Sequence, residues 1–395
     1  MKRILTLFAI LFAVVSCSTP PKDIPVWTFS EDPSDVPVPN ESEKERTEIS
    51  PYTDMVLIYG FGTHRTPYNW SKDYMGDYVV YSDPSGKQHW LFDAFLCLEF
   101  MSPGLGSEGK TFITGYKNDG HYMESANKGD WYNLIDYYFK KDVNVGAIDA
   151  AVGEAAATLG APPHKRQIVI GVPEPIEYLY NNYGSNQSGG TTYWGEIDGE
   201  QMDFSRSSDR LKAMKWYIDT VREKFYAQNY QNVELGGFYI TAERSDFLED
   251  VLPELGEYVA SLNYSFNWIP YFKAAGYDKW KRYGFTYAFM QPNYFFQDTI
   301  PYDRLVEACE IVIKNGMGLE IEFDGKVQKS YGWGYRLRDY MKCTKDYGVW
   351  ENSKLVYYQG SWAVRWIKRS SEEEDRQLYE DFCQWVISRP LRDSH

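Results

Sequence analysis

Three glutamates lie within apolar segments of this chain that have the alternating pattern of β-strands. Glu243 ends the segment Phe238–Glu243, and Glu320 and Glu322 share one face of the segment Gly318–Asp324. A carboxyl group inside an apolar strand is costly unless the protein pairs it or uses it. Glycosidic hydrolysis needs two facing carboxyl groups: one protonated to donate to the leaving oxygen, the other ionised as nucleophile or as base for water. We therefore predict Glu243, Glu322 and Glu320 as candidate catalytic residues. The alternative is that acids such as Glu320 pair with a basic residue, for example Arg282 or Lys326.

Polar and aromatic side chains also follow the other predicted strands. Such groups suit the binding of sugar hydroxyls and the stacking of sugar rings, although any one of them could instead cap a loop. The predicted substrate-binding residues are His64, Arg65, Glu99, Glu174, Tyr239, Asn267, Trp268, Gln291, Asn293, Asp324, Gln359 and Trp362. Asp93, deeper in the second strand, is predicted to be structural.

The composition favours a carbohydrate ligand over a nucleic acid. Aromatic residues make up 17% of the 395 residues, with 34 Tyr and 13 Trp, and their rings offer a flat apolar face with a polar edge. The 41 basic and 56 acidic residues give a net charge of -15, which repels phosphate backbones and anionic lipid headgroups. We expect a carbohydrate substrate and no nucleic-acid partner.

Eight short apolar runs could form buried strands, and segments of helical periodicity lie between them. Eight is the number of strands that closes a parallel (β/α)8 barrel of the TIM type, whose functional groups lie at the carboxyl ends of the strands. The alternatives are a doubly wound sheet or two domains, but the chain shows no second linker and no dinucleotide fingerprint. The predicted strands are Met55–Phe61, Leu91–Met101, Gln167–Val172, Val233–Glu243, Leu262–Phe272, Phe285–Phe296, Gly318–Asp324 and Leu355–Gln359.

The spacing of apolar residues also predicts particular helices. One begins near Asp209 and continues to Phe225, and another runs through Leu305 and stops at Gly316. The stretch between the second and third strands is longer than one crossover requires. It therefore predicts an insertion that includes a helix over Trp131–Lys141.

The N-terminus has the features of a lipoprotein signal peptide. Lys2 and Arg3 precede an apolar run that ends at Val15-Ser16-Cys17 and is too short to span a bilayer, which needs ~20 residues. We predict removal of residues 1–16, acylation of Cys17, a flexible tether over 17–50 and a barrel domain over 51–395. The protein would be an outer-membrane lipoprotein of the cell envelope that contacts the membrane through its lipid alone.

No pattern predicts a cofactor or a metal. Residues Gly104–Thr111 match the P-loop pattern, but Phe112-Ile113-Thr114-Gly115 is a poor start for the helix that a P-loop needs. The five histidines lack metal-ligand spacing, and Cys97 and Cys309 fall in apolar segments typical of buried free thiols.

Three segments carry a family resemblance. Leu91–Phe95, Gly237–Glu243 and Gly318–Asp324 resemble an uncharacterised bacterial family that is classed as a domain of unknown function and is frequent in Bacteroides-type lipoproteins. The similarity covers most of the mature chain and implies no settled activity.

More distantly, acids at the ends of the fourth and seventh strands resemble the large clan of retaining glycoside hydrolases on (β/α)8 barrels. This resemblance implies Glu243 as the acid/base and Glu322 as the nucleophile, with Glu320 as its rival. Ala242 stands where that clan usually has the Asn that holds the sugar 2-hydroxyl.

Three functions are consistent with these observations. The first is a lipid-anchored glycoside hydrolase that cleaves an oligo- or polysaccharide by two-carboxylate chemistry. The second is a non-catalytic glycan-binding lipoprotein of a polysaccharide-utilisation system, acting with other glycan-utilisation proteins. The third is a structural protein of the envelope. New reducing ends from a glycan panel would indicate the first, and retention without product the second.

Overall fold

The computed structural model describes residues 46–61, 65, 69–102, 109–114, 117–118, 121–122, 124–177 and 194–394. The predicted signal peptide, Cys17, most of the predicted tether and His64 lie outside the described residues.

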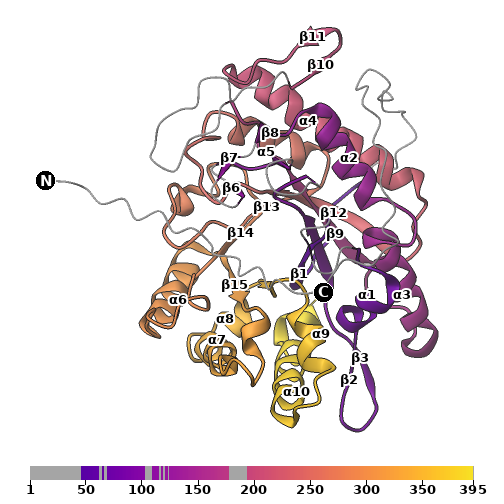
Figure 1. Cartoon of the computed structure of the whole chain (residues 1–395), viewed down its shortest axis with the longest axis vertical. Coiled ribbons are helices and arrows are strands. Elements are labelled where there is room, and N and C mark those ends of the chain that lie inside the picture. Colours follow the sequence, from indigo (N-terminus) through magenta and orange to yellow (C-terminus); the bar gives the residue numbers. More distant parts are fainter. Residues whose placement is uncertain are drawn as a thin grey trace, which may run out of the picture. The chain divides into compact units, whose positions relative to one another are not determined.

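Eight parallel strands close into a barrel (Figure 1), which confirms the predicted (β/α)8 fold. Around the barrel the order is β1-β16-β15-β14-β13-β12-β9-β4, and each predicted segment overlaps one of these strands, although β1 and β9 each begin one residue earlier than predicted. The bounds are β1 (Asp54–Tyr59), β4 (Ala94–Leu98), β9 (Arg166–Val172), β12 (Val233–Ile240), β13 (Ser265–Trp268), β14 (Tyr287–Met290), β15 (Gly318–Glu322) and β16 (Leu355–Tyr358). Several are shorter than predicted because apolar residues continue beyond the last ladder hydrogen bond into the loops.

Helices surround the barrel, and the two that were predicted from their spacing are present. The chain after Arg206 forms α4, and the second predicted helix is α6, which ends at Gly316 with φ 61. The helices are α1 (Lys72–Val79), α2 (Lys128–Tyr138), α3 (Asn144–Leu159), α4 (Ser207–Ala227), α5 (Leu252–Ser261), α6 (Asp303–Asn315), α7 (Gly334–Asp346), α8 (Val349–Asn352), α9 (Ala363–Lys368) and α10 (Glu373–Ile387). Among the described residues, none of the helices combines the length and the apolar character needed to cross a bilayer.

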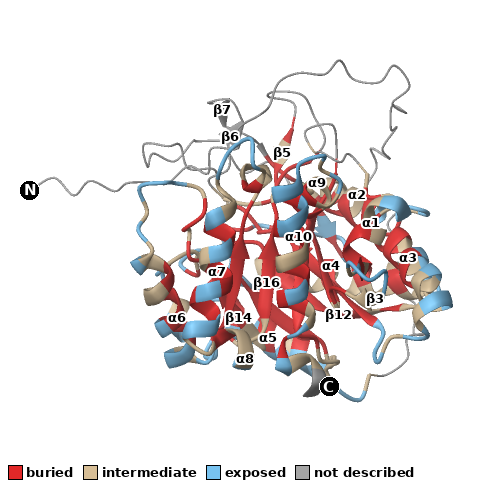
Figure 2. Ribbon diagram, turned by 90° about the horizontal axis from the view of Figure 1, so that it is seen from below, coloured by how far each residue is buried: buried red, intermediate tan, exposed pale blue. Residues whose placement is uncertain are grey.

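The predicted insertion lies between β4 and β9. It contains the short strands β5 (Lys110–Thr111), β6 (Lys117–Asn118), β7 (His121–Tyr122) and β8 (Glu124–Ser125), followed by α2. Figure 2 shows β5, β6 and β7 at one end of the barrel and the C-terminus at the other. The insertion therefore adds structure to the end where the strands finish.

Two apolar layers make up the core (Figure 2). One fills the space between the strands and the helices, and the other fills the inside of the barrel with residues such as Leu57, Leu96 and Phe289. The walls meet closely where Gly237 of β12 faces β13, because a Cβ on Gly237 would lie 2.0 Å from Ser265 Oγ. No larger residue fits there without moving the two strands apart.

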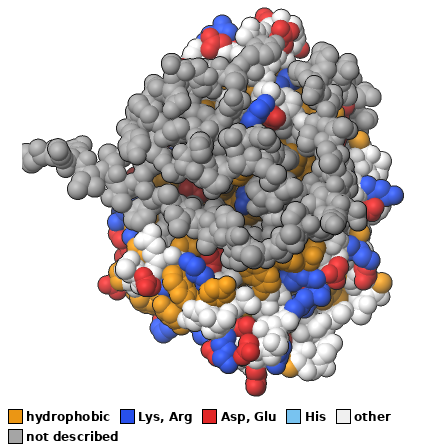
Figure 3. All heavy atoms as spheres, viewed as in Figure 1, with side chains coloured by type: hydrophobic (Ala, Val, Ile, Leu, Met, Phe, Trp, Pro, Cys, Tyr) orange, Lys and Arg blue, Asp and Glu red, His pale blue; other side chains and the backbone are white. Residues whose placement is uncertain are grey.

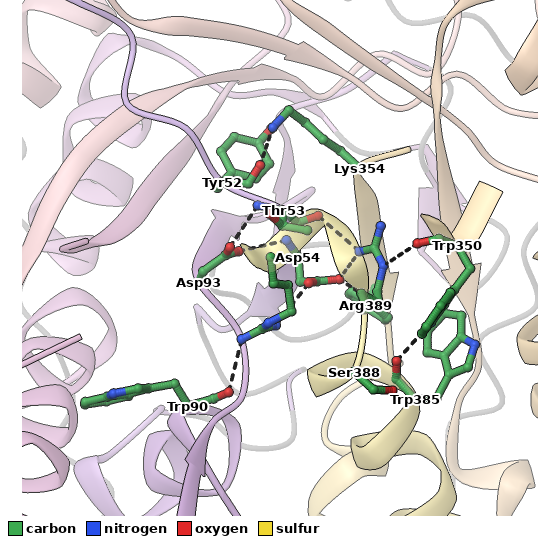
Figure 4. A network of polar contacts seen from close by, with 12 residues as sticks. Tyr52, Thr53, Asp54, Trp90, Asp93, Trp350, Lys354, Trp385, Ser388 and Arg389 are labelled. Atoms are coloured by element: carbon green, nitrogen blue, oxygen red, sulfur yellow. Dashed lines mark hydrogen bonds and ion pairs between the residues drawn. The ribbon is translucent and has the colours of Figure 1, made fainter. Parts of the chain in front are cut away.

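A buried polar network closes the barrel at the beginning of β1 (Figure 4). The Asp54 carboxylate accepts a hydrogen bond from Tyr357 Oη at 2.6 Å and pairs with Arg389 and with Arg392, the latter at 3.0 Å. Asp93 accepts hydrogen bonds from the amides of Thr53 at 2.9 Å and of Asp54 at 2.7 Å. Asp93 thus has the structural role that the sequence predicted. Arg389 and Arg392, which follow α10, hold the start of β1 in place through Asp54.

Arg46 attaches the segment before β1 to the same end of the barrel. Its guanidinium pairs with Glu234 at 3.0 Å, donates to the Leu235 carbonyl at 2.7 Å and lies over the Tyr264 ring. Glu234 and Leu235 are near the start of β12, far along the strand from Glu243.

The described cysteines are buried free thiols, as predicted for Cys97 and Cys309. The Sγ atoms of Cys309 on α6 and Cys343 on α7 are 3.8 Å apart.

Candidate active site

Strand register directs Glu320 and Glu322 into the barrel. In β15 they pair with Val356 and Tyr358 of β16, and both of these residues belong to the apolar cluster inside the barrel. Paired residues of neighbouring strands point to the same face of a sheet, so the two carboxyl groups enter the interior. Because β15 ends at Glu322, Glu322 lies at the rim and Glu320 lies deeper.

Of the three glutamates, Glu322 has the most hydrogen-bond donors. Tyr340 Oη donates at 2.6 Å, and the backbone amides of Tyr294, at 3.3 Å, and Asn293 also donate to it. Burial raises the pKa of Glu322 to about 7, while these donors stabilise its charged form. Its Oε1 atom is buried without a partner among the described residues, so one oxygen remains available.

Burial favours the neutral form of Glu320. Its side chain is 1% exposed, and burial together with the nearby Glu322 and Glu243 raises its pKa well above the usual value. Tyr239, also predicted as a site residue, lies inside the barrel close enough to interact with both Glu320 and Glu243. Among the described residues, Glu320 Oε2 has no hydrogen-bond partner. The structure therefore does not show the basic partner that the alternative requires.

Glu243 follows the end of β12 and approaches the same space. Burial raises its pKa to about 7, and a hydrogen bond from the Gln291 side chain opposes that increase. The Gln291 side chain also lowers the pKa of Glu320, so one amide lies near acids from the fourth and seventh strands of the barrel. Gln291 Oε1 is buried without a partner among the described residues. The three glutamates and Gln291 therefore form one polar cluster, which we call the acid cluster.

Two further predicted residues support this cluster or its rim. Asn293, which follows β14, has φ 53 and contributes its backbone amide to Glu322. Asp324 accepts a hydrogen bond from the Lys326 amide at 2.7 Å and caps the short 3-10 helix Gly325–Val327. Asp324 thus shapes the loop after β15.

The predicted residues of the first strands form contacts of their own. Arg65 donates from Nε to Glu99 Oε2 at 2.6 Å, and its guanidinium lies over the Tyr59 ring, which faces the barrel interior. Glu174 accepts hydrogen bonds from Thr114 at 2.8 Å and 2.6 Å, which attach the insertion to the end of β9. Glu174 is therefore part of the scaffold of the rim.

Asn267 and Trp268 were predicted together as substrate-binding residues, and the structure places neither in the acid cluster. They are neighbours on β13 and so point to opposite faces of the sheet. Trp268 faces the helices and stacks on Phe285 with ring centroids 5.2 Å apart. Asn267 faces inward, but its side chain accepts from Tyr52 Oη at 2.6 Å and donates to the Phe238 carbonyl.

Gln359 and Trp362 also lie outside the acid cluster. Gln359 accepts a hydrogen bond from Tyr78 Oη of α1 at 3.0 Å, and the Trp362 ring packs edge-on against Tyr74 of α1 at 4.8 Å. Both residues attach the end of β16 to the helix layer.

Sequence reasoning missed Tyr340 and the amide of Tyr294. Tyr340 is on α7, 18 residues beyond Glu322 along the chain. A buried helical tyrosine looks like any core residue in a sequence, so no pattern distinguished it. Among the described residues, no group of three or more His, Cys, Asp or Glu residues could hold a metal ion.

Comparisons with known proteins place this chain in a family and beside several barrels. The model described as "Domain of unknown function (DUF4855)" matches residues 54–384. No curated protein matches the chain.

Several solved structures match this chain at low similarity. A GH18 chitinase from Pseudoalteromonas aurantia is 12% identical with a TM-score of 0.41, covering 84% of this chain and 99% of that chain. The Bacillus subtilis mannanase man26 is 10% identical with a TM-score of 0.40, covering 85% and 86%. A tryptophan synthase alpha-subunit from Pyrococcus furiosus is 10% identical with a TM-score of 0.32, covering 85% and 99%.

Proposed function

We propose that this protein hydrolyses glycosidic bonds with Glu243 and Glu322. The chain belongs to the DUF4855 family, whose description assigns no function, so the proposal is argued from the site. The observation that carries the proposal is that the ends of the fourth and seventh strands bring the half-buried Glu243 and the buried Glu320 and Glu322 into one polar cluster with Gln291. The cluster also contains carboxyl oxygens without protein partners among the described residues.

The environments of the two acids suggest their roles. Glu322 receives donors from Tyr340, Tyr294 and Asn293, which favour its ionised form, whereas Glu243 receives one side-chain donor, from Gln291. Pairs of titratable groups in different environments divide the acid and base functions between them. We assign Glu243 as the proton donor and Glu322 as the ionised carboxylate.

In the proposed reaction, Glu243 transfers its proton to the oxygen of the leaving sugar while the glycosidic bond breaks. Glu322 either attacks the anomeric carbon, with water later releasing the sugar, or takes a proton from the water that attacks. The first route retains and the second inverts the anomeric configuration, and they correspond to carboxyl separations of ~5–5.5 Å and ~6.5–9.5 Å. Glu320 lies deeper in the barrel. Because burial favours its neutral form, it adds no second negative charge next to Glu322.

The decisive experiment measures new reducing ends after incubation of the protein with a panel of polysaccharides. Replacing Glu243→Gln or Glu322→Gln should lower the rate by a factor of ~10²–10⁴, the range for loss of a general acid or base. Glu234→Gln is the matched control, because Glu234 is half-exposed near the start of β12, at the opposite end of the strand from the segment that carries Glu243. Full activity in both site variants would refute the proposal, and retention of a glycan without product would indicate a binding protein.

We further propose that Cys17 is acylated and that the protein acts in the cell envelope as an outer-membrane lipoprotein. The support is the charged start, the short apolar run and the Ser16-Cys17 junction. A neutral or cationic glycan suits the net charge of -15 better than an anionic one.

A further inference from the structure

Large exposed apolar side chains are concentrated after the two strands that carry the glutamates. Among the described residues, the large apolar side chains that are exposed are Phe247, Ile313, Tyr331 and Tyr335. Phe247 follows β12, Tyr331 is in the loop after β15 and Tyr335 is in the first turn of α7, so three of these four side chains come shortly after the strands that lead to Glu243 and Glu322. Single exposed apolar residues are normal, but a group at one place indicates binding.

The segment from the loop after β15 into the first turn of α7 carries three aromatic residues, in the sequence Tyr331-Gly332-Trp333-Gly334-Tyr335. We call the three aromatic residues the aromatic shelf. Tyr331 is 57% and Tyr335 51% exposed, and Trp333 is partly buried. The glycines between them have no side chains to cover the rings, and Gly332 has φ 76, which a larger residue rarely adopts. Figure 3 shows hydrophobic side chains on the face of the molecule that is viewed in Figure 1.

A buried arginine holds the shelf in place. Arg336 is 2% exposed, its guanidinium lies 5.4 Å from the Trp333 ring centroid, and its Nε donates to Tyr335 Oη at 3.2 Å. The same guanidinium donates to the carbonyls of Asp298, at 2.9 Å, and Ile300, at 3.1 Å. Rings held in this way lose little conformational entropy when a ligand stacks on them.

The shelf is connected to the acid cluster through one residue. Arg336 donates to the carbonyl of Tyr294, and the amide of Tyr294 donates to Glu322. The Arg336 guanidinium also lies 4.2 Å from the Tyr294 ring centroid. The shelf and Glu322 are therefore positioned by the same segment after β14, so a ligand bound at one is placed relative to the other.

We propose that the aromatic shelf binds sugar rings of a neutral polysaccharide chain whose scissile bond lies at the acid cluster. This inference rests on the proposed function and adds to it the class of substrate, a polymer instead of a short oligosaccharide. Tyrosine and tryptophan rings offer apolar faces and polar edges that match a sugar ring. The net charge of -15 excludes polyanionic chains from strong binding.

Binding is tested in a Glu243→Gln background by native gel electrophoresis in soluble galactomannan, xylan, mixed-linkage β-glucan and glycol chitin, with polygalacturonate as the anionic comparison. We expect at least one neutral polymer to retard the protein. The double change Tyr331→Ala with Tyr335→Ala should weaken that binding roughly tenfold, the effect of losing two aromatic contacts.

The matched control is Ile313→Ala on α6, because Ile313 is 55% exposed but is near the end of α6 that leads into the start of β15. It should leave retardation unchanged. Equal binding by the double variant and the control would overturn the shelf, as would the absence of retardation by all four neutral polymers.

Hydrolysis separates this inference from the proposed function. In the otherwise unaltered protein, the double variant should cleave the polymer more slowly and cleave 4-nitrophenyl glycosides, which reach only the acid cluster, at the normal rate. Normal cleavage of the polymer would reject the shelf and keep the hydrolase. Shelf-dependent binding without any cleavage would keep the shelf and reject the hydrolase.

Discussion

At Glu243, Glu320 and Glu322, burial and mutual repulsion act on carboxyl groups that approach one another. Removal from water raises all three pKa values, and the proximity of Glu322 and Glu243 raises that of Glu320 further. Hydrogen bonds then distinguish them, because donors surround Glu322 and few reach Glu243. One proton-donating acid and one ionised carboxylate can therefore coexist near neutral pH.

The assigned roles predict different pH profiles for two substrates. The pKa values of both Glu243 and Glu322 are about 7, so kcat/KM on a polysaccharide should form a bell centred near pH 7. A 2,4-dinitrophenyl glycoside needs no proton for its leaving group, so Glu243→Gln should keep most activity on it and lose the alkaline fall. Glu322→Gln should be inactive on both substrates. The reverse pattern would exchange the two roles.

The free energy of unfolding should also depend on pH through Glu243. The pKa of Glu243 is about 7 in the folded protein against 4.5 ordinarily, so the folded state binds a proton that the unfolded chain has released between those values. The free energy of unfolding should therefore fall as pH rises through this window. Glu243→Gln removes the cost of ionising this carboxyl group in the folded protein. The change should therefore stabilise the protein at pH 8 by up to about 3 kcal/mol and by little at pH 4.5. Urea denaturation at the two pH values measures this, and an equal change at both would contradict the assignment.

Among the elements, β12 and β13 are the most sensitive to size. Gly237→Ala would place a Cβ 2.0 Å from Ser265 Oγ and 2.3 Å from Ser265 O, so the strand that leads to Glu243 would shift. We expect a loss of about 1–3 kcal/mol in stability or more, typical of overpacking, and reduced activity.

Gly76→Ala is the control for that change, because Gly76 is in helix α1 and a Cβ there meets nothing within 4 Å. It should stabilise the protein by about 0.5–1 kcal/mol. Thermal unfolding compares the two variants, and a harmless Gly237→Ala would show that the strands can separate.

The chain after α10 stabilises the barrel through β1. Arg389→Met would remove a cation that is 1% exposed and pairs with the buried Asp54, so we expect a loss of about 3–5 kcal/mol. The exposed pair of Arg338 with Asp381 provides the comparison, and Arg338→Ala should cost less than about 1 kcal/mol. Urea midpoints that fall equally would mean that burial of the pair contributes nothing.

On the scale of the whole molecule, the proposed lipid anchor predicts where the protein is found. Cys17→Ser should move the protein from the membrane fraction to the soluble fraction and abolish labelling by radioactive palmitate, because no thiol remains to be acylated. Membrane retention of that variant would reject the anchor. Arg46 fixes the start of the described chain at the barrel end opposite Glu322, so loss of the anchor should leave hydrolysis of a soluble glycan unchanged.

The sequence by itself determined the eight strands and the two that carry acids. Strands of a parallel barrel are buried on both sides, so they appear as apolar runs, and an acid inside such a run is conspicuous. The same local pattern could not show which of Asn267 and Trp268 faces the barrel interior, because side-chain direction at a strand end depends on where the hydrogen-bonded ladder stops.

Only the tertiary structure decided which groups meet the acids. Gln291 joins Glu243 to Glu320, and Tyr340 reaches Glu322 from a helix, although these residues are far apart along the chain. Closure of the barrel brings their strands and helices together. A hydrogen bond between distant segments leaves no local pattern in a sequence, and burial, which raises the pKa values, is a property of the folded chain alone.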